Sequence, residues 1–154
     1  MTAAAAIAVS RAGGAAAETE ADASPPSAAQ VRRILRAALP AGAKVAVRFV
    51  TAAASRELNQ RYLAKDRPAN VLAFPAEDGG PGGDIAICPA VVAAEAKQCN
   101  VPAFERYAHL LVHAALHLQG FEHETAAAAR RMEAREAEVM ASLGLPDPWA
   151  ADKA

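Results

Sequence analysis

The sequence predicts a mixed fold in which strands and helices follow one another along the chain and pack in layers. Residues 44–50 alternate apolar and polar side chains, a period typical of a half-buried strand. Residues 27–41 carry apolar side chains at intervals of three and four, a period typical of an amphipathic helix. A chain of 154 residues can bury a core without disulfide bonds, so we expect one domain over residues 1–154.

The first part of the chain is rich in alanine. Residues 4–9 are apolar and form the first predicted strand, although alanine is a poor strand former. Residues 11–24 combine a glycine pair with alternating acids, and we expect a flexible low-complexity loop there. A helix should begin at Pro26 or Ser27, with apolar residues on one face and arginines on the other, and end before Gly42.

The middle of the chain is predicted to contain most of the strands. The strand at 44–50 is followed by a short helix that Thr51 can cap and that reaches Tyr62. Residues 70–74 form the next strand, and residues 85–88 form another after a glycine-rich turn.

Three helices are predicted in the C-terminal third. Pro89 suits the first turn of a helix that ends near Asn100. Pro102 begins a second helix, which is apolar on nearly all sides and should therefore be buried. The last helix covers about residues 125–143, and Gly144 ends it.

Composition narrows the classes of function. A net charge of −1 argues against a globally basic nucleic-acid binder, so any RNA contact must come from a local basic patch or a metal site. The two cysteines, Cys88 and Cys99, form no CxxC pair, which predicts a reducing, cytoplasmic compartment and no disulfide-linked partner. We expect both thiols to be buried. The chain has no charged start typical of a signal peptide and no window of about 18 apolar residues, so we expect no membrane contact.

The most informative motif holds three histidines, in the stretch HAALHLQGFEH that begins at His113. His113 and His117 are one turn apart on a helix and project from the same face. Gly120 can end the helix in a left-handed conformation, so that the chain turns back and brings His123 toward the other two. Three converging neutral imidazoles are typical of a catalytic zinc site, whose fourth position stays open for water. The motif therefore predicts one zinc ion per chain, bound by His113, His117 and His123.

The fourth histidine, His109, is not expected to be a ligand. It precedes His117 by eight residues, about 12 Å along a helix, so these two side chains cannot share one metal. We expect His109 to pack in the interior or to support a ligand imidazole. Because the imidazole ligands must be neutral, metal binding should weaken in acid.

The order and spacing of the histidines equal those of the metzincin metallopeptidase signature, HExxHxxGxxH. They predict a metzincin-like helix that carries the first two ligands. In that signature a glutamate follows the first histidine and acts as general base, whereas Ala114 stands there in this chain. A metallopeptidase is therefore an alternative that Ala114 disfavours.

Three blocks of the sequence resemble the YbeY family, metal-dependent bacterial endoribonucleases of ribosomal RNA maturation. They are LNQRYLAKDRPANVLAFP at 58–75, GDIAI at 83–87 and the histidine motif at 113–123, in the family's order. The resemblance covers roughly residues 27–149. It implies an α+β fold, a small mixed β-sheet with several helices, one of them buried and bearing the first two histidines.

The resemblance also implies a function. It suggests a zinc-dependent, single-strand-specific endoribonuclease of ribosomal RNA maturation and ribosome biogenesis, which hydrolyses phosphodiester bonds with a metal-activated water. Its implied partners are ribosomal RNA and components of the small ribosomal subunit. The chain departs from the family at Ala114, where glycine is usual, and at Glu122, where aspartate is usual.

A further departure is Leu63, which stands where the family has an arginine that is thought to serve catalysis. Leu63 therefore keeps a third hypothesis open, a non-catalytic metal-binding factor that associates with the ribosome. The open fourth position of a three-histidine site favours catalysis, because structural zinc sites are usually closed.

The remaining candidate contacts each have two interpretations. Glu122 either orients a ligand imidazole or is a solvated acid of the loop. Arg61, Lys65 and Arg67 lie between two predicted strands and either face RNA phosphates or form a solvated surface. The resemblance favours the functional interpretation of Lys65. A general base cannot be assigned from the motif.

Overall fold

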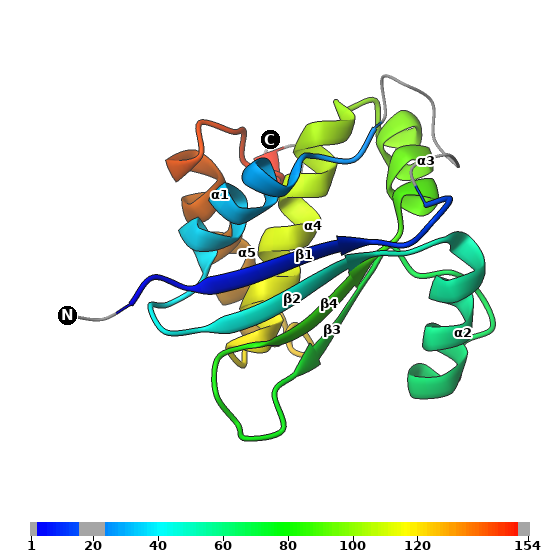
Figure 1. Ribbon diagram of the computed structural model, residues 1–154. Helices are drawn as coiled ribbons and strands as arrows, with labels where there is room; N and C mark the ends of the chain where they lie inside the picture. The colour runs from blue at the N-terminus through cyan, green and yellow to red at the C-terminus, as the bar shows by residue number, and fades with distance from the viewer. Residues whose placement is uncertain (1–2, 16–23, 151–154) are drawn as a thin grey trace.

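The computed structural model describes residues 3–15 and 24–150 (Figure 1). Over these residues the chain forms one sheet and five helices, in the order β1 (Ala6–Arg11), α1 (Ala28–Ala38), β2 (Lys44–Phe49), α2 (Ala52–Leu63), β3 (Val71–Pro75), β4 (Gly83–Ile87), α3 (Pro89–Cys99), α4 (Ala103–Leu118) and α5 (Ala126–Ser142).

The sheet is small and mixed, as the resemblance implied. Its strand order is β1-β2-β4-β3. β1 and β4 each pair with β2 in parallel, whereas β3 pairs with β4 antiparallel, with Ala73 opposite Ile85. β3 is thus an edge strand, and one side of its backbone is free of strand partners within the described chain.

The two faces of the sheet are covered by different helices. Val45, Val47 and Phe49 of β2 are buried on the face that α1, α4 and α5 cover (Figure 1). Leu72 of β3 belongs to a smaller cluster with residues of α2, on the other face. α4 lies at the centre, with 10 buried residues among its 16, which confirms the predicted buried helix that carries the first two motif histidines.

Local signals account for the helix ends. Ser27 accepts a hydrogen bond from the Gln30 backbone, and the Gln30 side chain accepts one from the Ser27 backbone, a capping box that starts α1. Thr51 caps α2 as predicted. Asn100 ends α3 with a φ of 54°, the left-handed conformation that asparagine tolerates.

Several details differ from the prediction, including β4, which covers Gly83–Ile87 and not 85–88. The first strand lies at Ala6–Arg11 and not at 4–9, because its pairing with β2 sets its ends. Arg11 therefore closes a strand. Residues 16–23 of the loop predicted at 11–24 lie outside the described residues. Cys88 is buried, but Cys99 is exposed in the last turn of α3, so its predicted burial was wrong.

No helix among the described residues has the length and apolar character that crossing a membrane requires.

Candidate metal centre and cleft

The end of α4 brings the three motif histidines together. Its last turn closes when Gly120 donates a backbone hydrogen bond to His117 at 3.0 Å and Phe121 donates one to Leu116 at 3.1 Å. Gly120 has a φ of 93°, which only glycine adopts at little cost. The chain then reverses, and His123 comes to lie beside the helix, as the motif predicted.

The three imidazoles are placed as ligands of one metal ion would be. One nitrogen of each of His113, His117 and His123 lies within 4.8 Å of the other two. The Nε2 atoms of His113 and His117 are 3.1 Å apart. Two nitrogens bound to one tetrahedral zinc at about 2.0–2.1 Å would lie about 3.4 Å apart, so the donor set fits that ion.

Glu136 of α5 orients the first of these histidines. Its Oε2 accepts a hydrogen bond from His113 Nδ1 at 3.0 Å. A proton on Nδ1 leaves the lone pair of a neutral imidazole on Nε2, which is the atom that faces His117. Glu136 thus selects the tautomer that a metal at this position needs.

The Glu136 carboxylate also binds two further groups. Oε2 accepts a hydrogen bond from His109 Nε2 at 2.8 Å, and Oε1 accepts one from Trp149 Nε1 at 3.0 Å. Burial by itself would raise the pKa of Glu136, but the hydrogen bonds and charges of His109 and His113 outweigh it and lower the pKa to about 2. The carboxylate is therefore ionised at neutral pH although it is only 1% exposed.

His109 is buried and is joined to the candidate metal centre through this carboxylate. It is not among the residues that converge on one point in the described chain. The structure therefore agrees with the prediction that His109 packs in the interior or supports a ligand.

His117 is held in a neutral form by its surroundings. Burial lowers the pKa of His117, and the charges of His113 and His123 lower it further. The charge of Glu122 and a hydrogen bond with the Phe121 backbone raise it by less. Glu122 Oε2 is 3.9 Å from His117 Nδ1, too long for a hydrogen bond, and the Glu122 side chain is 60% exposed. In this structure Glu122 is therefore a carboxylate at the mouth of the site, without a hydrogen bond to the imidazole.

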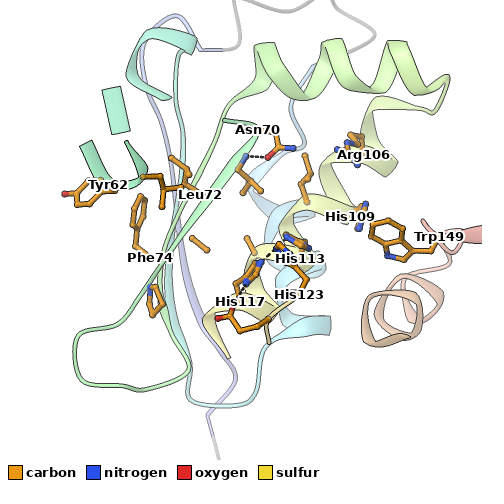
Figure 2. Close-up of a pocket in the computed structure, with 17 residues that line it drawn as sticks. Tyr62, Asn70, Leu72, Phe74, Arg106, His109, His113, His117, His123 and Trp149 are labelled. Atoms are coloured by element: carbon orange, nitrogen blue, oxygen red, sulfur yellow. Dashed lines mark hydrogen bonds and ion pairs between the residues drawn. The ribbon is translucent and has the colours of Figure 1, made fainter. Parts of the chain in front are cut away.

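A cleft of about 720 Å³ opens beside the histidines. Its walls come from α4, from the edge strand β3, from the end of α2 and from the C-terminal segment. Figure 2 shows His113, His117 and His123 gathered together, with Tyr62 and Phe74 at one end and Trp149 beside His109 at the other. The Tyr62 ring rests edge-on against Phe74, with centroids 5.1 Å apart.

The predicted basic contacts lie outside this lining. Arg61, Lys65 and Arg67 are exposed, and none of them lines the cleft. Leu63 does line it and is 53% exposed, so an apolar side chain faces solvent at this end of the cleft. In the described lining the one arginine is Arg106 of α4, and there is no lysine.

Sequence reasoning missed Glu136, Trp149 and Arg106. A signal for Glu136 was present: it lies four residues from both Met132 and Met140, which are buried, so an acid occupies the inward face of an amphipathic helix. Such an acid needs partners, and the histidines of α4 were the candidates.

Comparison with known proteins identifies the family. Residues 17–144 match the family model described as "Endoribonuclease YbeY". The Endoribonuclease YbeY of Halorhodospira halophila is 44% identical over 140 residues, which cover 84% of this chain and 91% of that protein. The protein of the same name from Paraburkholderia phytofirmans is 46% identical over 118 residues, covering 75% and 77%.

A solved structure shares the fold. The solution structure of TM1509 from Thermotoga maritima matches with a TM-score of 0.55 over 89% of this chain and 91% of that one, at 24% sequence identity. The family model and the curated relatives each span most of the chain, so the chain belongs to the endoribonuclease YbeY family.

Proposed function

We propose that this chain is a zinc-dependent endoribonuclease that cleaves single-stranded RNA during ribosomal RNA maturation. Its relatives carry the name endoribonuclease, which supports hydrolysis of RNA as the reaction class. The observation that carries the proposal is the convergence of His113, His117 and His123 in an open cleft. Zinc bound by three neutral imidazoles would lower the pKa of a bound water and polarise a phosphoryl oxygen, which together serve phosphodiester hydrolysis.

The residues around the histidines have separate tasks in this proposal. Glu136 keeps the His113 proton on Nδ1 and so directs Nε2 into the cleft. Glu122 is the one carboxylate in the described lining, and without a hydrogen bond to His117 its oxygens are available to the substrate. Arg61, Lys65 and Arg67 are exposed next to the α2 end of the cleft and would contact RNA outside it.

Two alternatives make different demands on the same site. A metallopeptidase needs an acid directly after the first histidine, and Ala114 is apolar and 1% exposed. A non-catalytic factor would need only the fold and the metal, and Leu63 agrees with it. The open cleft beside the three histidines supports catalysis.

The experiment that separates these readings compares three substrates. Zinc-loaded protein is incubated with labelled single-stranded RNA, with a duplex of the same sequence and with an unstructured peptide. We expect cleavage of the single strand alone and loss of cleavage in His117→Ala. Cleavage of the peptide would overturn the endoribonuclease, and binding of RNA without cleavage would favour the non-catalytic factor.

The cellular setting is part of the proposal. Ribosomal RNA and components of the small ribosomal subunit would be the partners, in the cytoplasm. Neither Cys88 nor Cys99 forms a disulfide bond within the described residues, in keeping with a reducing compartment.

A further inference from the structure

Among the described residues that line the cleft, Arg106 is the one arginine, and there is no lysine. Its guanidinium keeps its positive charge at any physiological pH. Arg106 precedes His113 by seven residues on α4, two turns earlier and on the same face, so it lies about 10 Å further along the helix axis. We propose that Arg106 binds a backbone phosphate of the RNA that flanks the one at the three-histidine centre. This inference rests on the proposed function, because it assigns a subsite of the same cleft.

The Arg106 side chain is held in place before any ligand binds. Its Nη2 donates to Glu95 Oε1 at 2.9 Å, and its Nε donates to the same oxygen at 3.3 Å. Glu95 of α3 also accepts hydrogen bonds from Asn70 Nδ2, at 3.0 and 3.2 Å. Asn70 in turn accepts from the Val71 backbone through Oδ1 at 2.6 Å. The network therefore ties Arg106 to the start of β3, on the opposite wall of the cleft (Figure 2).

This arrangement leaves the guanidinium with capacity for a phosphate. Arginine has five N–H donors, and the two contacts with Glu95 use two of them. Because the planar guanidinium of Arg106 is already fixed, it loses little conformational entropy when it binds an anion. The side chain is 23% exposed, so solvent screens it less than it screens Arg61, Lys65 and Arg67 on the surface.

Charge and spacing decide which phosphate Arg106 can reach. Its backbone lies about 10 Å before that of His113 along the helix axis, and its guanidinium is held against Glu95 of α3, so Arg106 is placed to bind a phosphate that neighbours the scissile group. The Glu95 carboxylate next to it would repel that phosphate, so Glu95 should oppose RNA binding. The two residues are therefore expected to affect affinity in opposite directions.

The first test measures RNA binding against salt. A labelled, unstructured 12-nucleotide RNA is titrated with protein that carries His117→Ala, which the proposed function predicts to be inactive; binding is read by fluorescence anisotropy, and a gel confirms that the RNA is intact. Arg106→Gln should bind about tenfold more weakly at low salt, the loss of one charged hydrogen-bonding contact. Its slope of log affinity against log salt should fall by about 0.7, the value for one phosphate of a single strand.

Two further variants separate binding from structure. Glu95→Gln keeps an acceptor for Asn70 and Arg106 but removes the negative charge, so it should bind RNA more tightly than the wild type. Arg135→Gln removes an arginine that pairs with Glu138 at 2.9 Å on the exposed face of α5, and it should leave the salt slope unchanged. If Arg106 only joins α3 to α4, then Arg106→Gln will unfold at a lower temperature but keep the wild-type slope, and the proposal is wrong.

Cleavage kinetics test the position of the subsite. Arg106→Gln should raise KM on the 12-nucleotide RNA and leave kcat nearly unchanged, because its contact is present before and during reaction. On a dinucleotide, which has one phosphate, the variant should equal the wild type. An equal loss of cleavage activity on the 12-nucleotide RNA and on the dinucleotide would contradict the flanking subsite. Absence of cleavage in every variant, with the salt slope still lowered, would refute the proposed reaction but support the phosphate contact.

Discussion

Glu136 Oε2 lies 3.0 Å from His113 Nδ1, on the side of the imidazole away from the candidate metal position. One buried carboxylate therefore joins α5 to the histidine motif of α4. The same carboxylate binds His109 and Trp149, so the geometry of the site depends on residues far from the motif in sequence.

Glu136→Gln should weaken zinc binding by about 10- to 100-fold, the usual effect of losing a carboxylate behind a ligand imidazole. Both histidines donate to the same oxygen, so an amide that keeps this oxygen points its NH2 group at the Trp149 N–H, and the flipped amide points it at both histidines. Zinc affinity is measured by competition with a chromophoric chelator. Glu138→Gln on the same helix, an exposed carboxylate, is the matched control and should match the wild type. Equal affinities for all three proteins would show that Glu136 does not support the site.

The purified protein should carry about one zinc per chain and lose it to a chelator. His113→Ala, His117→Ala and His123→Ala should each lower occupancy sharply, because each removes a ligand. His109→Ala should lower it much less, since His109 reaches the site only through Glu136. Metal content by elemental analysis checks the series, and full occupancy in His123→Ala would rule out the proposed ligand set.

Trp149→Phe should destabilise the fold by about 1–2 kcal/mol, because Glu136 Oε1 loses its donor while it stays buried. The free energy of unfolding is obtained from urea titrations followed by circular dichroism. The same variant should retain zinc, since the His113 contact remains. An unchanged unfolding free energy would show that the Trp149 hydrogen bond contributes no stability.

Leu63→Arg should keep or raise RNA cleavage, because a guanidinium suits a phosphate and position 63 lines the cleft. The gain should be modest, since the side chain there is exposed and screened by salt. Cleavage by Leu63→Arg alone, with an inactive wild type that still binds RNA and zinc, would support the non-catalytic factor.

Neutralising Arg61 and Lys65 together should weaken RNA binding and lower its salt dependence.

Much of the fold was predictable because its signals are local. Alternating side chains marked β2, the Ser27 and Thr51 caps marked α1 and α2, and Asn100 marked the end of α3. The convergence of the three histidines was also predictable, since it follows from helical spacing and one glycine turn. These features depend on residues within a few positions of each other.

The rest depends on contacts between distant segments. The ends of β1 are set by pairing with β2, which no pattern within β1 encodes. Glu136 is 23 residues from His113, and Arg106 of α4 contacts Glu95 of α3. No periodic pattern in the sequence therefore predicts either contact. Exposure of Cys99 follows from where α3 lies against α4 and not from the character of a thiol.

The central claim is that the three-histidine site cleaves RNA when it holds one metal ion. Its most direct test titrates metal-free protein with zinc and follows cleavage of labelled single-stranded RNA, beside His117→Ala. We predict that the cleavage rate rises with zinc and levels off at one equivalent per chain, and that His117→Ala stays inactive throughout. Equal cleavage by both proteins, or cleavage that does not depend on zinc, would contradict the claim.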